Sequence, residues 1–491
     1  MRHSTKKMLL VLPKPYAVDL NEMGHVRRRL GVPGGIMNAS LPTVAALTPK
    51  EVAVRIVDET VEPIDFDEPV DLVGIGGFHS SIKRAGEIAR EFSRRGVLVA
   101  AGGPSVCLSP ERWRPLADVL IMGEAERIWP QFMADYLAGR HLPEYRETGA
   151  VDLGLTPLPD FSAISPAARK LYWAGIVQTS RGCPFDCEFC DTIVYVGRRP
   201  RYKPVENIIL ELDQLQRLGF RSVFLADDNF GANRAKAKQI LSALGEWNHR
   251  QRRSMHFATQ ISIDAANDEE LLALLANAGL TLAFVGIETP NRDALSEASK
   301  TQNLRNDLAE NIKAFHEHGI MVWGGLMVGF DSDDASIFQR QYDLFQTAGV
   351  SQVSFNMLHA PDGTPLKARM IRENRYLDQV NRDSLEGLNF GVPEVIPSHM
   401  TFDQLFDGAV WLMWQLTTPQ NTMDRVKKFL QDYENSARKK ALDIPRFQVR
   451  LQELKPKRTK SAIRSLVPGP FAGVIPTGFR PSIVVGTKRV A

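Results

Sequence analysis

The stretch that decides the fold is Thr179-Ser180-Arg181-Gly182-Cys183-Pro184-Phe185-Asp186-Cys187-Glu188-Phe189-Cys190. It holds three of the four cysteines in the 491-residue chain, and their spacing is C-x3-C-x2-C. Cysteine thiolates are the usual protein ligands of iron–sulfur clusters. Three thiolates leave one iron of a four-iron cluster without a protein ligand, and an open metal position indicates chemistry there. The pattern therefore predicts a catalytic cluster on Cys183, Cys187 and Cys190.

A structural zinc site and a disulfide framework are the alternatives. Zinc takes four ligands in structural sites, and neither a histidine nor a fourth cysteine lies near the stretch. A disulfide framework needs an even number of cysteines in a secreted chain. The remaining cysteine, Cys107, stands alone and is predicted to be a buried or partly buried residue.

The cysteine stretch resembles the signature of the radical S-adenosylmethionine (SAM) superfamily, including Phe189, the aromatic residue before the last cysteine. The resemblance implies a [4Fe-4S] cluster whose open iron is chelated by the amino and carboxylate groups of SAM. It also implies a reducing partner, such as flavodoxin or ferredoxin. One electron then cleaves SAM to a 5′-deoxyadenosyl radical, which abstracts hydrogen from a small-molecule substrate.

The composition is typical of a soluble protein of about two to four domains, with 44% apolar residues, 24% charged residues and a net charge of +3. No apolar run approaches the roughly 18 residues that span a bilayer. The apolar run at residues 8–12 is too short for a signal peptide and ends at Pro13. The sequence therefore predicts a cytoplasmic protein, where thiols stay reduced.

Residues 1–145 alternate short apolar runs with helical patterns, which is typical of a doubly wound, Rossmann-like α/β domain. Ligands of such sheets bind at the carboxyl ends of the strands. Strands are expected at Met8–Leu12, Val52–Val57, Leu72–Gly76, Val97–Ala101 and Val119–Met122. Helices are expected at Pro42–Leu47, Ser81–Arg95, Pro110–Leu116 and Ile128–Leu137.

Glycine-containing turns follow three of these strands, and glycine lets a large ligand approach the backbone. Together with Asp71–Ile75, these turns resemble the recurring blocks of the cobalamin-binding domain that precedes many radical SAM domains. The resemblance implies that cobalamin is contacted by Gly77, Gly102, Gly103, Gly123 and Glu124.

The motif D-x-H-x-x-G, whose histidine ligates cobalt in domains of the methionine-synthase kind, is absent from the chain. The resemblance therefore implies base-off cobalamin without that ligand. His79 is a candidate lower ligand, and its simpler interpretation is a turn histidine. For the domain as a whole, the alternative is a Rossmann-like domain that has lost its ligand.

Residues 146–172 are rich in proline and glycine and are predicted to form an extended linker over the surface. The βα pattern resumes over residues 173–395 and fits a partial (βα)6 barrel, in which strand carboxyl ends carry the chemistry. Strands are expected at Gly175–Thr179, Ser222–Leu225, His256–Gln260, Leu282–Ile287, Met321–Val328 and Gln352–Met357. Helices are expected at Pro204–Leu218, Ala235–Trp247, Glu269–Ala278 and Arg305–His318.

Polar residues follow several of these strands, at the places where the superfamily holds SAM. The resemblance implies that Asp227 and Asp228 bind the SAM amino group. It implies that Ser262 and Glu288 bind ribose hydroxyls and that Gly325 lies against adenine. The alternative for the two aspartates is a helix cap, for which one would suffice. A basic residue of Arg201–Lys203 is implied near the cluster or the SAM carboxylate, unless this segment is a solvated turn.

Residues 396–491 are predicted to be a basic helical extension, with helices over Phe402–Leu416 and about Met423–Glu434. From Asp424 to Ser465, thirteen Lys/Arg stand against five Asp/Glu. This excess fits either a solvated tail or peripheral contact with anionic lipid headgroups. The aromatic residues of this stretch do not alternate with the basic ones, which argues against nucleic acid as a partner.

With Gly329–Asp333 and Pro361–Leu366, this region resembles the radical SAM branch with a DUF4070-type C-terminal region, to which hopanoid C-2 methylases belong. The resemblance implies a cobalamin-dependent methyltransferase acting on an unactivated carbon, such as one of a hopanoid-like lipid. One alternative is an oxidoreductase, cyclase or lyase that uses cobalamin without methyl transfer, as the anaerobic porphyrin ring cyclase does. The other is a non-catalytic cluster protein.

Overall fold

The computed structural model describes residues 5–15, 34–147, 149–305, 307–377 and 394–437. The chain divides into two compact units. Unit 1 comprises residues 1–183 and 191–226, and unit 2 comprises residues 184–190 and 227–491. The cysteine stretch passes from one unit into the other, because Cys183 belongs to unit 1 whereas Cys187 and Cys190 belong to unit 2. The domain boundaries expected from the sequence stay predictions.

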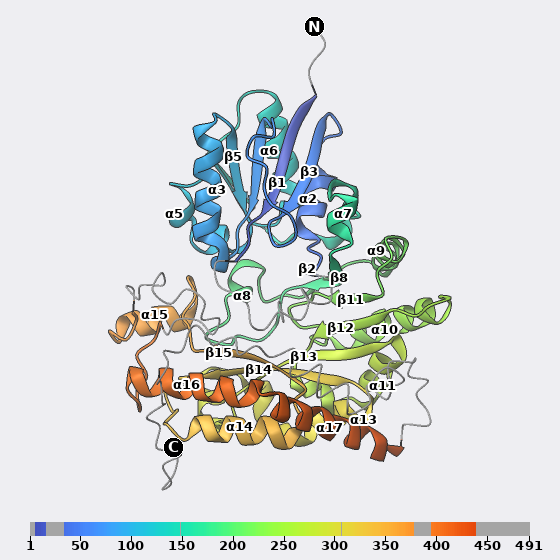
Figure 1. Ribbon diagram of the computed structural model, residues 1–491, viewed down its shortest axis with the longest axis vertical. Coiled ribbons are helices and arrows are strands. Elements are labelled where there is room, and N and C mark those ends of the chain that lie inside the picture. The colour runs from blue at the N-terminus through green and yellow to red at the C-terminus, as the bar shows by residue number, and fades with distance from the viewer. Residues whose placement is uncertain (1–4, 16–33, 148, 306, 378–393, 438–491) are drawn as a thin grey trace. The chain divides into compact units, whose positions relative to one another are not determined.

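A six-stranded parallel sheet forms the N-terminal part of unit 1, with the order β3-β1-β4-β5-β6-β7 (Figure 1). β1 lies between β3 and β4, so the direction of the connections reverses there. Sheets of this kind bind ligands in the crevice at such a reversal. The strands are β1 (Lys6–Leu12), β3 (Val52–Asp58), β4 (Leu72–Gly76), β5 (Leu98–Gly102), β6 (Val119–Met122) and β7 (Glu144–Arg146).

Helices cover both faces of this sheet, which explains why its strands are apolar without alternation. On one face, Phe92 and Trp113 join a buried cluster with sheet residues such as Val73. On the other face, Trp129 donates from Nε1 to Oγ1 of Thr48 at 2.9 Å. The covering helices are α2 (Ser40–Leu47), α3 (Ile82–Arg94), α4 (Pro104–Leu108), α5 (Pro110–Trp113) and α6 (Ala125–Leu137).

A second group of parallel strands in unit 1 includes the strand that leads into the cysteine stretch. The strands of this group are β2 (Gly34–Ile36), β8 (Tyr172–Val177) and β11 (Ser222–Leu225), and β8 pairs in parallel with the other two. Helix α9 (Val205–Arg217) packs on β8 through Leu215. A Cβ atom at Gly175 would lie 2.8 Å from that leucine, so the glycine permits the close packing.

The segment 146–172 is not the exposed linker that its proline and glycine content indicates. It pairs with the N-terminal sheet through the bridge between Ile164 and Ile56. Asp152 and Asp160 accept hydrogen bonds from the backbone N of Gly154 and Ser162, each at 2.9 Å, and so begin two short turns. Its buried residues include Val151, Leu153, Phe161 and Ile164. Single buried residues in an irregular segment leave no periodicity in the sequence, which explains the error.

Unit 2 is built on parallel strands that pair in sequence order, namely β12 (His256–Gln260), β13 (Leu280–Glu288), β14 (Met321–Val328) and β15 (Gln352–Met357). Its principal helices around these strands are α10 (Arg234–His249), α11 (Glu269–Ala278), α13 (Leu308–Glu317) and α14 (Ile337–Ala348). Asp268 and Asp307 cap two of these helices by accepting hydrogen bonds from the first turn. These caps fix where the two helices begin.

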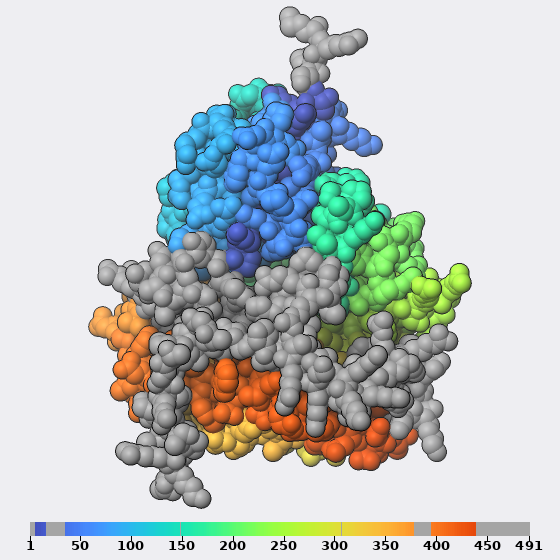
Figure 2. All heavy atoms as spheres, viewed as in Figure 1, coloured from blue at the N-terminus to red at the C-terminus, as the bar shows by residue number. Residues whose placement is uncertain are grey.

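Two helices close the described chain, α16 (Phe402–Thr417) and α17 (Pro419–Asn435), and both reach the surface in Figure 2, in orange and red. Arg425 of α17 is buried and donates to the carbonyl oxygens of Val350 at 2.6 Å and Leu416 at 2.8 Å. This residue is therefore not part of the predicted basic surface, most of which lies outside the described residues. Among the described helices, none combines the length and apolar character needed to cross a membrane.

The expected strands recur in the structure, most of them within two residues of the predicted ends. The helix expected at Pro110–Leu116 ends at Trp113. The sequence patterns did not predict β2, β7, α4, α12 (Arg292–Glu297), α14 or α15 (Pro365–Arg372). Two of these, α12 and α15, contribute residues to the site described below.

Asp333→Asn is expected to flatten the pH dependence of stability between about pH 4 and pH 6. Asp333 is buried, and although the backbone N of Gly329 and Phe330 donate to it, burial raises its pKa from 3.8 to about 6. The folded state therefore keeps a proton that the unfolded chain releases. The wild-type free energy of unfolding should fall by about 2–3 kcal/mol as pH rises through this window. Urea unfolding of both proteins across it measures the difference, and parallel profiles would contradict the assignment.

Candidate functional site

The second half of the cysteine stretch is fixed in unit 2 through Glu188, the residue that follows Cys187. Its backbone N donates to the carbonyl oxygen of Ala298 at 3.0 Å. Its own carbonyl oxygen accepts from the backbone N of Leu366 at 3.2 Å. Glu188 is thus held by residues from two distant parts of the chain, and the positions of the cysteines beside it are restricted.

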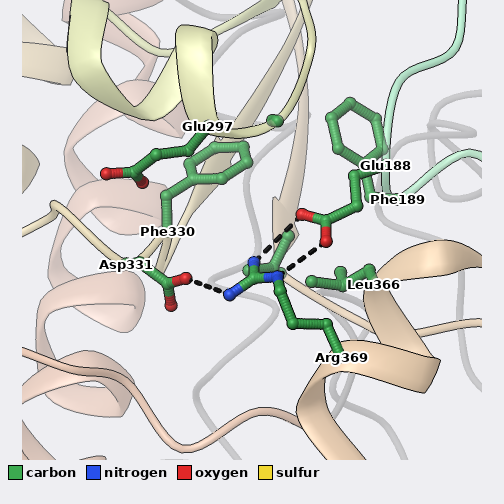
Figure 3. Close-up of a pocket in the computed structure, with 9 residues that line it drawn as sticks. Glu188, Phe189, Glu297, Phe330, Asp331, Leu366 and Arg369 are labelled. Carbon is green, nitrogen blue, oxygen red and sulfur yellow. Dashed lines mark hydrogen bonds and ion pairs between the residues drawn. The ribbon is translucent and has the colours of Figure 1, made fainter.

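The carboxylate of Glu188 is held by Arg369 of α15, as Figure 3 shows. The guanidinium donates from Nε to Oε1 at 2.6 Å and from Nη2 to Oε2 at 3.0 Å. This is the bidentate geometry that arginine forms with carboxylates. The same guanidinium donates to Asp331, which also accepts from Arg375 at 2.5 Å. Although burial opposes ionisation, hydrogen bonds from Arg375 and Arg369 lower the pKa of Asp331. Asp331 therefore stays ionised at neutral pH.

Phe189 lines the small pocket drawn in Figure 3 together with Glu188. Its ring packs edge-on against Phe330, with the centroids 6.2 Å apart. The ammonium of Lys300 lies 6.0 Å from the centroid of the Phe189 ring. The aromatic residue before the last cysteine is therefore an internal packing residue that faces a cation.

The two cysteines of unit 2 have surroundings that suit thiolate ligands. Cys187 is buried, and Gln302 directs its Nε2 at the Cys187 Sγ at 3.8 Å. Lys300 interacts electrostatically with the sulfurs of Cys187 and Cys190. Hydrogen-bond donors and cations near cluster sulfurs are how proteins tune such clusters. The donor chemistry of this half of the stretch fits an iron–sulfur cluster.

The described side chains do not form a complete metal-binding group. Within the part of the chain that the structure describes, no three His, Cys, Asp or Glu side chains are grouped so that they could hold a metal ion. Cys183, in unit 1, donates from its backbone N to the carbonyl oxygen of Gly197 at 3.4 Å. Ligation by the three cysteines therefore stays a prediction from their spacing.

The candidate SAM residues after β11 and β12 lie in unit 2. Asp227 is buried and Asp228 is half-buried. Asn229, which the sequence did not single out, donates from Nδ2 to Ser262 Oγ at 2.8 Å, and its Oδ1 accepts from the Ser262 backbone N at 3.2 Å. The structure therefore ties the loop of Asp227 and Asp228 to the loop of Ser262. Their roles toward SAM are untested and stay predictions.

Glu288 and Gly325 lie on neighbouring strands, β13 and β14. Gly286 pairs with Gly325, and the register shifts between Gly286 and Glu288. Glu288 adopts φ +61°, which is uncommon for a residue with a side chain, and its Oε1 accepts from Lys300 Nζ at 2.8 Å. A Cβ atom at Gly325 would lie 3.2 Å from the Phe284 ring. Contact of these residues with ribose and adenine stays a prediction, whereas the ion pair with Lys300 is a feature that sequence reasoning missed.

The predicted cobalamin turns follow β4, β5 and β6, which are neighbours in the sheet, so they share one edge of unit 1. The structure gives the glycines another reason than ligand approach. A Cβ atom would lie 2.8 Å from the Trp113 ring at Gly77, 2.9 Å from the Gly77 carbonyl oxygen at Gly103 and 2.6 Å from Glu147 at Gly123. Internal packing therefore explains these three, and the space above Gly102 is less restricted, with Ile121 at 3.4 Å.

Glu124, the acidic cobalamin candidate, is engaged by two arginines of unit 1. Arg201 donates from Nη2 to Oε1 at 2.5 Å and from Nη1 to Oε2 at 2.7 Å, and Arg181 donates to Oε2 at 3.1 Å. The solvated basic turn considered for Arg201–Lys203 is therefore wrong, because Lys203 is also buried and paired with Glu211. Contact of Glu124 with cobalamin stays a prediction.

His79, the candidate cobalt ligand, is half-buried in a short helical turn that follows Phe78. Its Nε2 lies 3.5 Å from Nη1 of Arg112. A guanidinium has only donors, so in this contact the imidazole nitrogen acts as the acceptor. The contact agrees with the simpler interpretation of His79 as a turn histidine.

The sequence relatives of this chain place it in the radical SAM class of enzymes. The profile described as "Radical SAM superfamily" matches residues 177–340. An uncharacterized methyltransferase of Synechocystis sp. is 34% identical over 78% of this chain and 71% of its own length. The hopanoid C-2 methylase of Rhodopseudomonas palustris is 33% identical over 70% of this chain and 66% of its own length. The chain belongs to the radical SAM superfamily, within a group whose relatives are methyltransferases.

A more distant relative is the bacteriochlorophyllide d C-12(1)-methyltransferase of Chlorobaculum tepidum, which is 27% identical over 76% of this chain and 80% of its own length. Among solved structures, the cobalamin-dependent radical enzyme OxsB, with aqua-cobalamin and SAM bound, matches with a TM-score of 0.65 and 16% identity over 94% of this chain and 70% of that chain. TsrM from Kitasatospora setae, with cobalamin and a [4Fe-4S] cluster bound, matches with a TM-score of 0.59 and 17% identity over 75% of this chain and 78% of that chain.

These likenesses confirm the α/β fold class, with its parallel sheets and helical C-terminal part. They also confirm that the protein is an enzyme, of a family that uses a [4Fe-4S] cluster and SAM. Cobalamin is bound by both structural neighbours, as the sequence led us to expect. The comparisons do not identify the substrate.

Proposed function

We propose that this protein is a cobalamin-dependent radical SAM methyltransferase that methylates an unactivated carbon of a large, mostly apolar substrate. The observation that carries this proposal is the 34% identity to a methyltransferase and the 33% identity to a hopanoid methylase, each over most of the chain. Two of the relatives are named for hopanoids and for a bacteriochlorophyllide, which are large apolar ring systems. That shared chemistry supports a polycyclic or isoprenoid substrate.

The residues of unit 2 support the proposal through the face of β13 and β14 that carries Glu288. Phe284 and Trp323 are paired across these strands, with ring centroids 5.0 Å apart and an interplanar angle of 87°. Both rings are half-buried, so part of each is accessible. Accessible aromatic surface on this face fits an apolar molecule.

In this proposal, the cluster and SAM supply a radical that takes hydrogen from carbon, and cobalamin supplies the methyl group. The chain binds and orients these partners and excludes water. Asp227, Asp228, Ser262 and Glu288 would bind SAM, and the glycine turns of unit 1 would contact cobalamin. The proposed chemistry requires no nucleophile–base pair.

Peripheral membrane contact would give access to a lipid substrate, and we propose it for the basic C-terminal segment. Only residues up to 437 of that segment are described. Within them, Lys427 is exposed, whereas Lys428 is half-buried and paired with Asp432. Pelleting of the full-length protein with anionic liposomes at low salt, and its release at high salt, is the matching measurement.

The proposal predicts transfer of labelled methyl groups from SAM to an apolar product. The protein would be reconstituted anaerobically with iron, sulfide and cobalamin. It would then be incubated with a reductant, methyl-deuterated SAM and total lipid and pigment extracts, and analysed by mass spectrometry. A labelled product together with 5′-deoxyadenosine would support methyl transfer. Formation of 5′-deoxyadenosine with an altered but unlabelled product would favour the oxidoreductase, cyclase or lyase alternative, and absence of both would overturn the proposal.

A further inference from the structure

A buried cation stands beside the cysteines of unit 2. Lys300 follows α12, its side chain is 14% exposed, and its Nζ donates to Glu288 Oε1 at 2.8 Å. Its Nζ also lies 6.0 Å from the centroid of the ring of Phe189, the residue between Glu188 and Cys190. The ammonium therefore lies beside the loop that carries these two cysteines, in a largely water-free environment where charges interact strongly.

A second polar side chain of this segment, that of Gln302, faces Cys187. Gln302 is 2% exposed, and its amide N–H points at the Cys187 Sγ across 3.8 Å. Its Oε1 has no hydrogen-bond partner among the described residues. Burying an unpaired amide oxygen costs free energy, and such a group calls for an explanation. Orientation of the N–H toward sulfur supplies one.

The backbone is strained at both ends of this arrangement. Within the described chain, the residues other than glycine with positive φ are Glu288 at 61°, Ser299 at 55° and Asn374 at 54°. Glu288 is the ion-pair partner of Lys300, and Ser299 is the residue immediately before Lys300. Two of the three positive-φ residues therefore belong to this arrangement. A Cβ atom at Gly286 would lie 2.4 Å from Glu288 Oε1 and 2.9 Å from Lys300 Nζ, so only glycine leaves room for the pair. Strained residues persist where the surrounding structure requires them, often at functional sites.

We propose that Lys300 and Gln302 set the reduction potential of the cluster bound by the cysteine stretch. The reduced cluster carries one more negative charge than the oxidised cluster, so a fixed cation nearby stabilises the reduced state more. A hydrogen bond to sulfur acts in the same direction. The negative charge of Glu288 partly cancels the effect of the Lys300 charge on the cluster. The inference rests on the proposed function only in requiring that the cysteines hold a cluster.

The test is an EPR-monitored redox titration of the full-length reconstituted protein, without SAM, cobalamin or substrate. Lys300→Met should lower the midpoint potential, so that the reduced fraction at a fixed potential falls about tenfold, equivalent to about 59 mV for one electron. Glu288→Gln should shift the midpoint the opposite way, because it leaves the cation less neutralised. Gln302→Leu should lower the midpoint by a smaller amount, and Lys300→Arg should keep it close to the wild-type value.

Lys313→Met is the matched control, since Lys313 is an exposed cation of α13 in the same unit, and its midpoint should equal that of the wild type. Iron and sulfide content is measured for every variant, so that loss of cluster is not mistaken for a shift. If Lys300→Met fails to assemble a cluster, the upward shift in Glu288→Gln still supports the proposal. Equal midpoints in the wild type and Glu288→Gln, or in the wild type and an assembled Lys300→Met, would overturn it. A wild-type protein that binds no cluster would overturn the proposed function as well, whereas failure of methyl transfer alone would leave these potentials measurable.

Discussion

Cys183→Ala, Cys187→Ala and Cys190→Ala are each expected to abolish the iron–sulfur absorbance and the reductive cleavage of SAM. Two thiolates do not hold a four-iron cluster, and the chain has no spare cysteine beside the stretch, since Cys107 is far from it in the sequence. The measurements are iron and sulfide content, the EPR spectrum of the reduced protein and the yield of 5′-deoxyadenosine. A full iron complement with SAM cleavage in any one of these variants would contradict the ligand assignment.

Cys107→Ala is the matched control for this experiment. Cys107 lies in unit 1, is half-buried and accepts a hydrogen bond from the backbone N of Gly123 at 3.2 Å. Burial raises the pKa of its thiol, which keeps it protonated and a poor metal ligand. The control should keep the wild-type iron content and SAM cleavage. Loss of the cluster in this control alone would indicate that Cys107 of unit 1, rather than the cysteine stretch, supports the cluster.

The sequence predicted the strands well because apolar runs of buried parallel strands are a strong local signal. It predicted the cysteine stretch because three cysteines in eight positions are a rare pattern. In contrast, Lys300 and Gln302 became visible only in the structure. Lys300 lies twelve residues after Glu288, with a short helix between them, and nothing in that spacing indicates an ion pair. Contacts of this kind arise from tertiary packing and leave no local pattern.

The glycine turns of unit 1 lie where the sequence predicts them, but their glycines also have a role in internal packing. The turns do follow neighbouring parallel strands, as predicted. However, Gly77 and Gly123 are already required by Trp113 and Glu147 of the chain itself. Their presence is therefore weaker support for cobalamin binding than the sequence indicates.

Arg369→Met is expected to lower the free energy of unfolding by about 2 kcal/mol and to reduce the iron retained after reconstitution. The change removes the guanidinium that holds Glu188 and Asp331, whose side chains are 17% and 20% exposed. Hydrogen bonds to charged groups contribute about 1.5–3 kcal/mol, and residual solvent access compensates part of that loss. Because Glu188 stands between two of the cysteines, release of its carboxylate should loosen the loop that presents Cys187 and Cys190. Urea unfolding of the apo protein and iron content measure the two effects separately.

Arg372→Met tests whether the effect belongs to Arg369 or to any arginine of α15. Arg372 lies on the same helix and is exposed, so its removal should change stability by less than about 0.5 kcal/mol and leave iron content unaltered. The double variant Glu188→Gln with Arg369→Met completes a thermodynamic cycle. If the two residues act through their mutual contact, the double variant should lose less than the sum of the single variants. Strict additivity, with normal iron content in Arg369→Met, would show that α15 stabilises unit 2 without positioning the cysteine loop.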